Sequence, residues 1–258
     1  MDYRRIKYWV ENSIAHLVFN DPGRLNPMDV PMLDDILSAL EACALDEGVK
    51  VLVMSGEGGS FSAGGDIRSM IDEFDTLPAL ARKLGEAALK IRNLKKPVIA
   101  SLKGAVAGAA FNLALLCDFR IAADNCRFLQ AFIKIGLIPD TGGVFLLTRM
   151  IGMARATELA MTGRTIDSQE AMSLGLLTRV VPLADLESET MRFAEQIAAS
   201  PGLALWKIKQ LVNRSALMGF ENHLENELEY QVSLFSTEDF KEGITAFAEK
   251  RRPNFRSR

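Results

Sequence analysis

The chain has 258 residues, of which 48% are hydrophobic and 24% charged, and its formal net charge is −3. A chain of this length can bury a large core, so we expect one α/β domain with an appendage. The slightly acidic balance provides no field that attracts nucleic acid, and no apolar run is long enough for a bilayer, so neither is expected as a partner. The three cysteines lack metal-binding spacing, which favours a cytoplasmic protein without a disulfide framework or metal site.

The first two thirds of the chain are predicted to alternate between strands and helices, the pattern typical of an α/β fold. Short β-favouring runs predict strands at 6–10, 14–19, 49–55, 98–102, 118–122, 127–129 and 178–181. Helical spacing of apolar residues, with caps and stops, predicts helices from 26 or 29 to 44 and at 68–73, 77–94, 111–117, 154–161, 167–174 and 185–199. Another is predicted after the loop at 135–143 and runs through 151. Residues 200–202, Ser-Pro-Gly, are the clearest boundary, and only helical pattern follows, at 203–215, 220–235 and 238–250. We therefore divide the chain into a core at 1–200 and a helical region at 201–258.

Two glycine-rich segments each follow a predicted buried strand. Residues 61–67 read Phe-Ser-Ala-Gly-Gly-Asp-Ile, and residues 103–110 read Lys-Gly-Ala-Val-Ala-Gly-Ala-Ala. Each is open to two readings: a plain turn between a strand and a helix, or a turn that brings a backbone N–H close to a ligand. Together they could supply the pair of donors that stabilises a developing oxyanion. Neither contains a dinucleotide fingerprint or a phosphate-binding loop.

Asp140 is one carboxylate among apolar neighbours in the loop at 135–143. It could cap the helix that follows, since aspartate is among the commonest caps. If it instead faces a closed apolar cavity, desolvation raises its pKa toward the range that suits a general base. Arg24 lies at the tip of a turn-rich loop, and two interpretations fit it equally well: a solvated surface charge, or a residue that binds an anion locally.

Four ordered motifs, covering essentially the whole chain, are similar to those of the crotonase superfamily, the enoyl-CoA hydratase and isomerase family. They are 61–67, 104–110, the Ile-Pro-Asp-Thr-Gly-Gly run at 138–143, and the Ala-Phe-Ala-Glu-Lys-Arg-Arg-Pro-Asn-Phe ending at 246–255. The resemblance implies an α/β fold, a spiral of ββα turns, with a C-terminal helical region used for trimerisation. It also implies an acyl-CoA substrate, a role in fatty acid metabolism, and a homotrimer or dimer of trimers. No cofactor is expected, because coenzyme A is part of the substrate.

The resemblance also carries site residues onto this chain. The oxyanion-hole N–H groups fall on Ala63 and Ala109, the latter where many relatives have glycine. Residues matched to the coenzyme A site are Arg24, Leu25, Asp66 and Ile67 in the core, and Phe247 and Lys250 in the tail, where relatives reach a neighbouring subunit's ligand.

The departures from the family pattern favour one reaction. Hydratases of the family handle water with two glutamates, and the matching positions here are Asn112 and Phe132. Asp140 matches the single acid/base carboxylate of the family's isomerases, to which the motifs are closest. We therefore expect an enoyl-CoA isomerase in which Phe132 keeps the cavity dry and Asn112 orients a ligand or supports the Ala109 loop. There are two alternatives: a hydratase, which is a lyase, in which Asp140 alone activates water, and a non-catalytic acyl-CoA-binding protein.

Overall fold

A six-stranded sheet forms the centre of the protein in the computed structural model, which describes residues 3–72, 74–215 and 217–256. The strand order is β1 (Ile6–Glu11), β2 (Ile14–Phe19), β3 (Val51–Gly56), β4 (Val98–Leu102), β6 (Phe119–Ala123) and β9 (Arg179–Val181). The first two strands form an antiparallel hairpin, and the remaining pairs are parallel. Asn12 and Ser13 make the hairpin turn with φ values of 51° and 64°, as their turn-forming character predicts.

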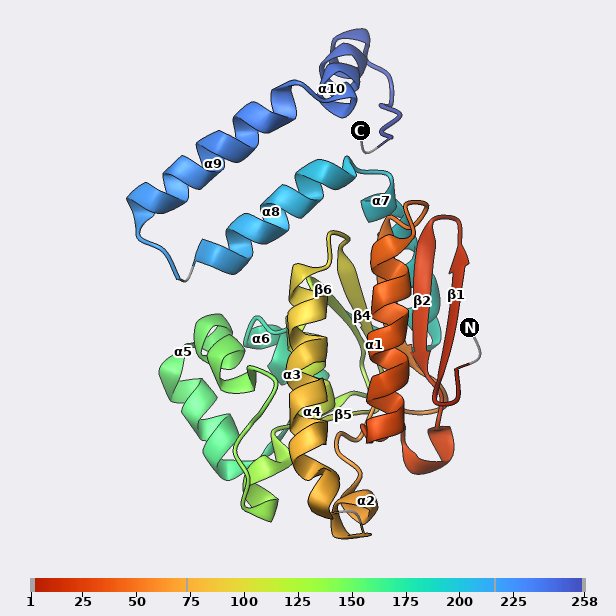
Figure 1. Cartoon of the computed structure of the whole chain (residues 1–258), viewed down its shortest axis with the longest axis vertical. Helices are drawn as coiled ribbons and strands as arrows, with labels where there is room; N and C mark the ends of the chain where they lie inside the picture. Colours follow the sequence, from red (N-terminus) through yellow and green to blue (C-terminus); the bar gives the residue numbers. More distant parts are fainter. Residues whose placement is uncertain (1–2, 73, 216, 257–258) are drawn as a thin grey trace.

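Helices cover both faces of this sheet. Figure 1 shows α1 (Val30–Leu45) and α3 (Leu77–Asn93) in front of the sheet, and α7 (Leu186–Ala198) behind it. Because both faces are covered, β3 and β4 are almost wholly buried, which explains why each is a continuous apolar run. The side chain of Asp29 begins α1 by accepting a hydrogen bond from the Met32 N–H, as predicted for a cap.

A second sheet has three short strands in the order β5 (Ala105–Ala107), β7 (Arg127–Leu129) and β8 (Thr165–Asp167). The chain passes from β4 to β5 and then into α4 (Gly108–Leu116), and in the same way from β6 to β7 and the 3-10 helix η3 (Ala131–Ile135). This repeated ββα progression confirms the predicted crotonase-like spiral. The helix α4 begins three residues earlier than predicted, and β5 and β8 were not predicted, because each forms a strand by pairing with β7.

The remaining helices of the core follow the prediction closely. They are α2 (Ile67–Asp72), α5 (Gly143–Thr162) and α6 (Ser168–Ser173). Two helices were expected on either side of residue 152, and α5 is indeed interrupted at Gly152, whose φ of 79° and ψ of 163° are not helical. The last residue of the helix predicted at 68–73 lies outside the described residues.

The C-terminal region consists of α8 (Gly202–Ser215), α9 (Phe220–Phe235) and α10 (Glu238–Glu249), which extend away from the sheet at the top of Figure 1. One buried cation fastens α8 to the core. Lys209, 7% exposed, donates to the Asp118 carboxylate at 2.8 Å and to the carbonyls of Ile91 and Lys96 at 3.1 and 3.3 Å. Among the described residues, no helix has the length and apolar character required to cross a membrane.

Candidate active site

The two glycine-rich turns lie against each other at the carboxyl ends of β3 and β4. Ser62 donates from its N–H to the Ala105 carbonyl at 3.0 Å and accepts from the Ala107 N–H at 3.1 Å. Gly64 packs so closely that an added Cβ would be 2.5 Å from the Ala107 carbonyl oxygen, and its φ of +88° also requires glycine. This pairing brings residues 63 and 109, far apart in sequence, to one wall of a cavity.

The two expected donors differ in their present hydrogen bonding. Ala109 is the second residue of α4, and N–H groups in the first turn of a helix have no partner within the helix. The N–H of Ala63, in contrast, donates to the carbonyl of Leu25 at 2.9 Å. Leu25 lies in an exposed turn with a left-handed φ of 59°. A ligand oxygen at the Ala63 N–H would therefore compete with the Leu25 carbonyl for this donor.

An apolar cavity of about 320 Å³ opens beside these turns. Its volume is in the range of ligand sites. Asp140 is the one ionisable side chain among the described residues that line it. The lining consists of Met28, Ala63, Gly65, Ile67, Met70, Leu77, Leu80, Ala81, Leu84, Gly108, Ala109, Ala131, Phe132, Ile135, Leu137 and Asp140. Five predicted site residues, at positions 63, 67, 109, 132 and 140, thus share one cavity.

Asp140 does not cap the helix that follows it, because α5 begins at Gly143 and its N-cap position is Gly142. Burial raises the pKa of the Asp140 carboxyl, while a 2.7 Å hydrogen bond from the Thr141 hydroxyl to its Oδ1 and the nearby Asn112 amide act in the opposite direction. Among the described side chains lining this cavity, therefore, one carboxylate is available to exchange a proton.

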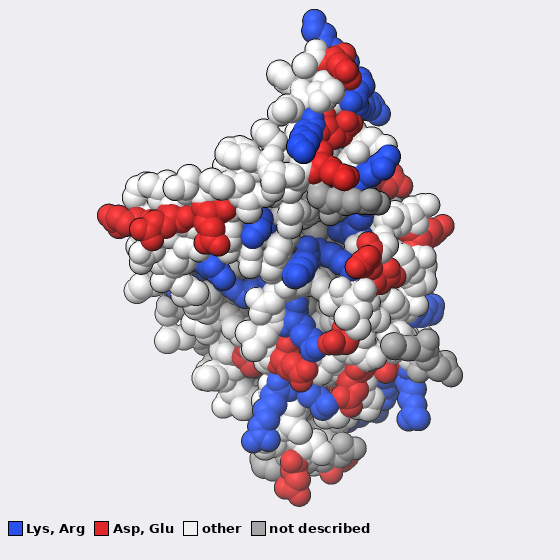
Figure 2. All heavy atoms as spheres, turned by 45° about the horizontal axis from the view of Figure 1, so that its top comes forward, with Lys and Arg blue, Asp and Glu red and all other residues white. Residues whose placement is uncertain are grey.

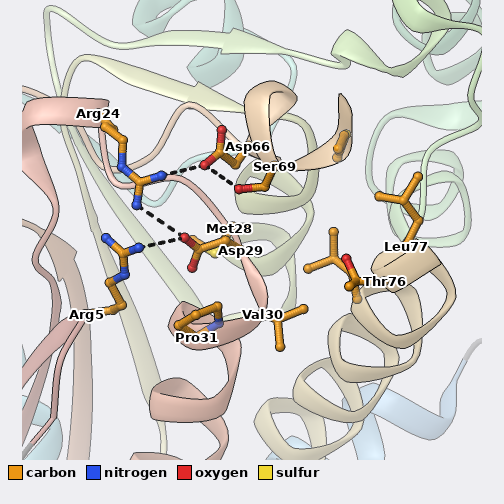
Figure 3. Close-up of a pocket in the computed structure, with 12 residues that line it drawn as sticks. Arg5, Arg24, Met28, Asp29, Val30, Pro31, Asp66, Ser69, Thr76 and Leu77 are labelled. Atoms are coloured by element: carbon orange, nitrogen blue, oxygen red, sulfur yellow. Dashed lines mark hydrogen bonds and ion pairs between the residues drawn. The ribbon is translucent and has the colours of Figure 1, made fainter. Parts of the chain in front are cut away.

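A smaller polar cavity of about 140 Å³ adjoins the apolar one and shares Met28, Met70, Leu77 and Leu80 with it. Figure 3 shows Arg24 directed between two carboxylates in this cavity, and its guanidinium donates to Asp66 at 2.5 Å and to Asp29 at 3.2 Å. Arg24 also binds Asp21 at 2.5 Å, so it is an ion-paired group of the cavity wall.

Asp66 begins α2 and also binds Arg24. Its carboxylate accepts hydrogen bonds from the Arg68 N–H at 3.1 Å and the Ser69 hydroxyl at 2.9 Å at the start of α2. Burial acts to raise the pKa of Asp66, but these hydrogen bonds and Arg24 hold that pKa below its usual value. The carboxylate therefore stays ionised and holds Arg24 beside the cavity.

The two tail residues are not brought to the site within one chain. Phe247 is 87% exposed and Lys250 is also exposed, both near the end of α10. Figure 1 places α10 at the end of the molecule opposite α2, which lies beside the cavity. Figure 2 shows acidic and basic side chains interspersed over the face turned to the viewer.

Two polar residues near Asp140 were not singled out from the sequence. Thr141 contacts the carboxylate directly, and Gln130, 1% exposed, donates from Nε2 to the Asn112 Oδ1 at 2.7 Å. The signal for Gln130 was its place after β7, at the strand end where the other site residues gather.

Comparison with known proteins agrees with this fold. Residues 10–258 match the enoyl-CoA hydratase/isomerase family, and the chain belongs to that family of enzymes. It is 40% identical to the trans-2-decenoyl-[acyl-carrier-protein] isomerase of Streptococcus mutans over 99% of both chains. It is 34% identical to the 1,2-epoxyphenylacetyl-CoA isomerase of Escherichia coli, covering 95% of this chain and 96% of the other. The structure of an enoyl-CoA hydratase from Bacillus anthracis superposes with a TM-score of 0.95 at 28% identity, covering 99% of this chain and all of the other.

Proposed function

We propose that the protein is an enoyl thioester isomerase that converts a 3-enoyl-CoA into the conjugated 2-enoyl-CoA. The observation that carries the proposal is the lining of the apolar cavity, in which Asp140 is the one ionisable side chain among the described residues. The positions that match the two hydratase glutamates hold Asn112 and Phe132, which cannot take a proton from water. Moving a proton between two carbons needs one carboxylate, whereas hydration also needs a positioned water.

The proposed mechanism uses the two turns and the carboxylate together. The thioester carbonyl binds between the N–H groups of Ala63 and Ala109, displacing the Leu25 carbonyl from Ala63. Asp140 removes a proton from C2, the resulting dienolate is held by the two donors, and Asp140 returns the proton at C4. One such donor typically lowers a barrier by about 2.7 to 4 kcal/mol. Phe132, 8% exposed, faces the same cavity and limits the access of water.

The polar cavity around Arg24 is the proposed site for the polar part of the thioester carrier. Asp66 lines the polar cavity, Ile67 lines the apolar one, and the Leu25 carbonyl accepts from the Ala63 N–H, so these residues would contact the pantetheine and adenine of coenzyme A. The name of the S. mutans relative specifies an acyl-carrier-protein thioester, and that of the E. coli relative a CoA thioester. Both carriers are therefore substrates to be compared.

We further propose that the active unit is a homotrimer or a dimer of trimers, in which Phe247 and Lys250 of one subunit reach the ligand of its neighbour. The described part of the tail supports this arrangement, because its helices expose many apolar side chains that a second copy could cover. They include Ile208, Val212, Phe220, Leu224, Leu228, Val232, Phe235, Phe240, Ile244 and Phe247. Light scattering should give a molar mass three or six times that of the chain, and a monomer would contradict the proposal.

The experiment that tests the reaction uses two substrates. Incubation with 3-hexenoyl-CoA should produce conjugated-thioester absorbance, and incubation with crotonyl-CoA should leave that absorbance almost unchanged. Loss of absorbance with crotonyl-CoA, without a gain from 3-hexenoyl-CoA, would establish hydration and reject the isomerase.

A further inference from the structure

A chain of buried amide groups lies behind Asp140, outside the cavity that would hold the substrate. Gln130 donates from Nε2 to the Asn112 Oδ1 at 2.7 Å, and Asn112 donates from Nδ2 to the main-chain carbonyl of Asp140 at 2.9 Å. The two side chains are 1% and 0% exposed. Leaving a buried polar group without a hydrogen bond costs free energy, so the bond from Gln130 Nε2 to Asn112 Oδ1 restricts the orientation of both amides.

The loop that carries Asp140 is shaped to receive the Asn112 side chain. A Cβ at Gly143 would lie 2.3 to 2.4 Å from the Oδ1, Cγ and Nδ2 atoms of Asn112, so the amide lies directly against the Gly143 backbone. Thr141 lies between Asp140 and Gly143 in this loop. It has a left-handed φ of 53° and donates its hydroxyl hydrogen to the Asp140 carboxylate. The backbone of Asp140 is thus held by Asn112, and its carboxylate is oriented by Thr141.

We propose that Asn112 and Gln130 are positioning residues that fix the Asp140 loop and so place its carboxylate at the substrate. This inference rests on the proposed role of Asp140 as the acid/base. Position 112 requires a side chain that accepts a hydrogen bond from Gln130 and donates one to the Asp140 carbonyl, and an asparagine amide does both. An ionised carboxylate at position 112 can only accept, so it cannot make the second bond. It also places a second negative charge near Asp140.

This pair of hydrogen-bonded amides accounts for the asparagine found where hydratase relatives carry a glutamate. In this protein the residue at that position donates a hydrogen bond to the backbone of Asp140. Small displacements of a catalytic group have large effects, since a misplacement of about 1 Å can reduce a rate by about 100-fold. Loss of the Asn112 bond should therefore reduce kcat more than it weakens substrate binding.

The test compares Asn112→Asp, which keeps the size of the side chain, with the matched control Asn213→Asp. Asn213 donates to the Arg92 carbonyl at 3.1 Å on α8 and does not line the apolar cavity. We expect Asn112→Asp to lower kcat by about 10- to 100-fold, with KM within about threefold. We also expect it to move the acid limb of the kcat/KM profile to higher pH, because a like charge disfavours ionisation of Asp140. The control Asn213→Asp should change neither kcat nor the acid limb of the kcat/KM profile.

A second variant, Gln130→Met, removes the support of Asn112 without adding charge. It should lower kcat several-fold and leave the acid limb in place, and it decides the matter if Asn112→Asp does not fold by circular dichroism. If Asn112→Asp folds, a wild-type kcat together with an unmoved acid limb would overturn the positioning role. If Asn112→Asp does not fold, a wild-type kcat in Gln130→Met would overturn it. Full activity of Asp140→Asn would instead overturn the proposed function, so the two failures are distinguishable.

Discussion

Replacement of Asp140 by asparagine should separate catalysis from folding. A general acid or base typically contributes about 10² to 10⁴ in rate. Because Asp140 is the proposed proton carrier for both steps, we expect a loss near the upper end. A loss of about 10³- to 10⁴-fold in kcat corresponds to about 4 to 5.5 kcal/mol. Binding of a CoA ester should stay within about threefold, since asparagine keeps the shape of the side chain.

The same substitution should not destabilise the protein at neutral pH. Burial raises the pKa of Asp140 in the folded state, so the folded protein holds that proton more tightly than the unfolded chain does. The stability linked to protonated Asp140 is therefore lost as the pH rises through the raised pKa. Asparagine does not titrate, so Asp140→Asn should be at least as stable as the wild type above that pKa.

The assay measures initial rates of conjugated-thioester formation from 3-hexenoyl-CoA, with CoA-ester affinity by calorimetry and stability by urea unfolding. Asp34→Asn, which changes an exposed carboxylate paired with Lys83, is the matched control and should leave the rate unchanged. Wild-type turnover in Asp140→Asn would remove this residue from the mechanism. A lower free energy of unfolding at neutral pH would contradict the inferred cost of burying its charge.

Three further predictions follow from the geometry. Because Asp140 must be ionised to accept the C2 proton, kcat/KM should rise with pH through a midpoint above the ordinary range of aspartate, and a midpoint within that range would contradict its desolvation. Gly64→Ala places a side chain at a φ of +88° and 2.5 Å from the Ala107 carbonyl oxygen. Urea unfolding should therefore show that the free energy of unfolding falls by about 1 to 3 kcal/mol or more. Its control, Gly85→Ala on α3, meets no atom within 4 Å and should be neutral or stabilising; equal effects would refute the crowding argument. Lys209→Met removes one partner of a buried ion pair and should cost about 3 to 5 kcal/mol in urea unfolding, and a loss below about 1 kcal/mol would show that this lysine does not anchor α8.

Much of the fold could be predicted because local patterns and tertiary environment agree. The continuous apolar runs of β3 and β4 predict strands buried on both faces, and both faces are covered by helices. A helix was expected to begin at residue 26 or 29, and Asp29 accepts the capping hydrogen bond there. The short strand β8 was not predicted, because its three residues become a strand only by pairing with β7.

The site could be predicted in outline but not in its contacts. Motif positions gave residues 63, 109, 132 and 140, which line one cavity. The partners of Arg24 depend on a loop whose path the sequence does not specify, so an ion-paired group was indistinguishable from a surface charge. The same limit concealed the Ala63 to Leu25 hydrogen bond and the place of Gln130, since both depend on the packing of distant segments.

The most direct test of the central claim, that one carboxylate moves the proton between two carbons, is the fate of the proton at C2. A 3-enoyl-CoA labelled with deuterium at C2 would be converted by the wild-type enzyme, and the product analysed by NMR and mass spectrometry. The account predicts a conjugated 2-enoyl thioester in which part of the deuterium is found at C4. A 3-hydroxyacyl product, or a conjugated product without deuterium at C4, would contradict it.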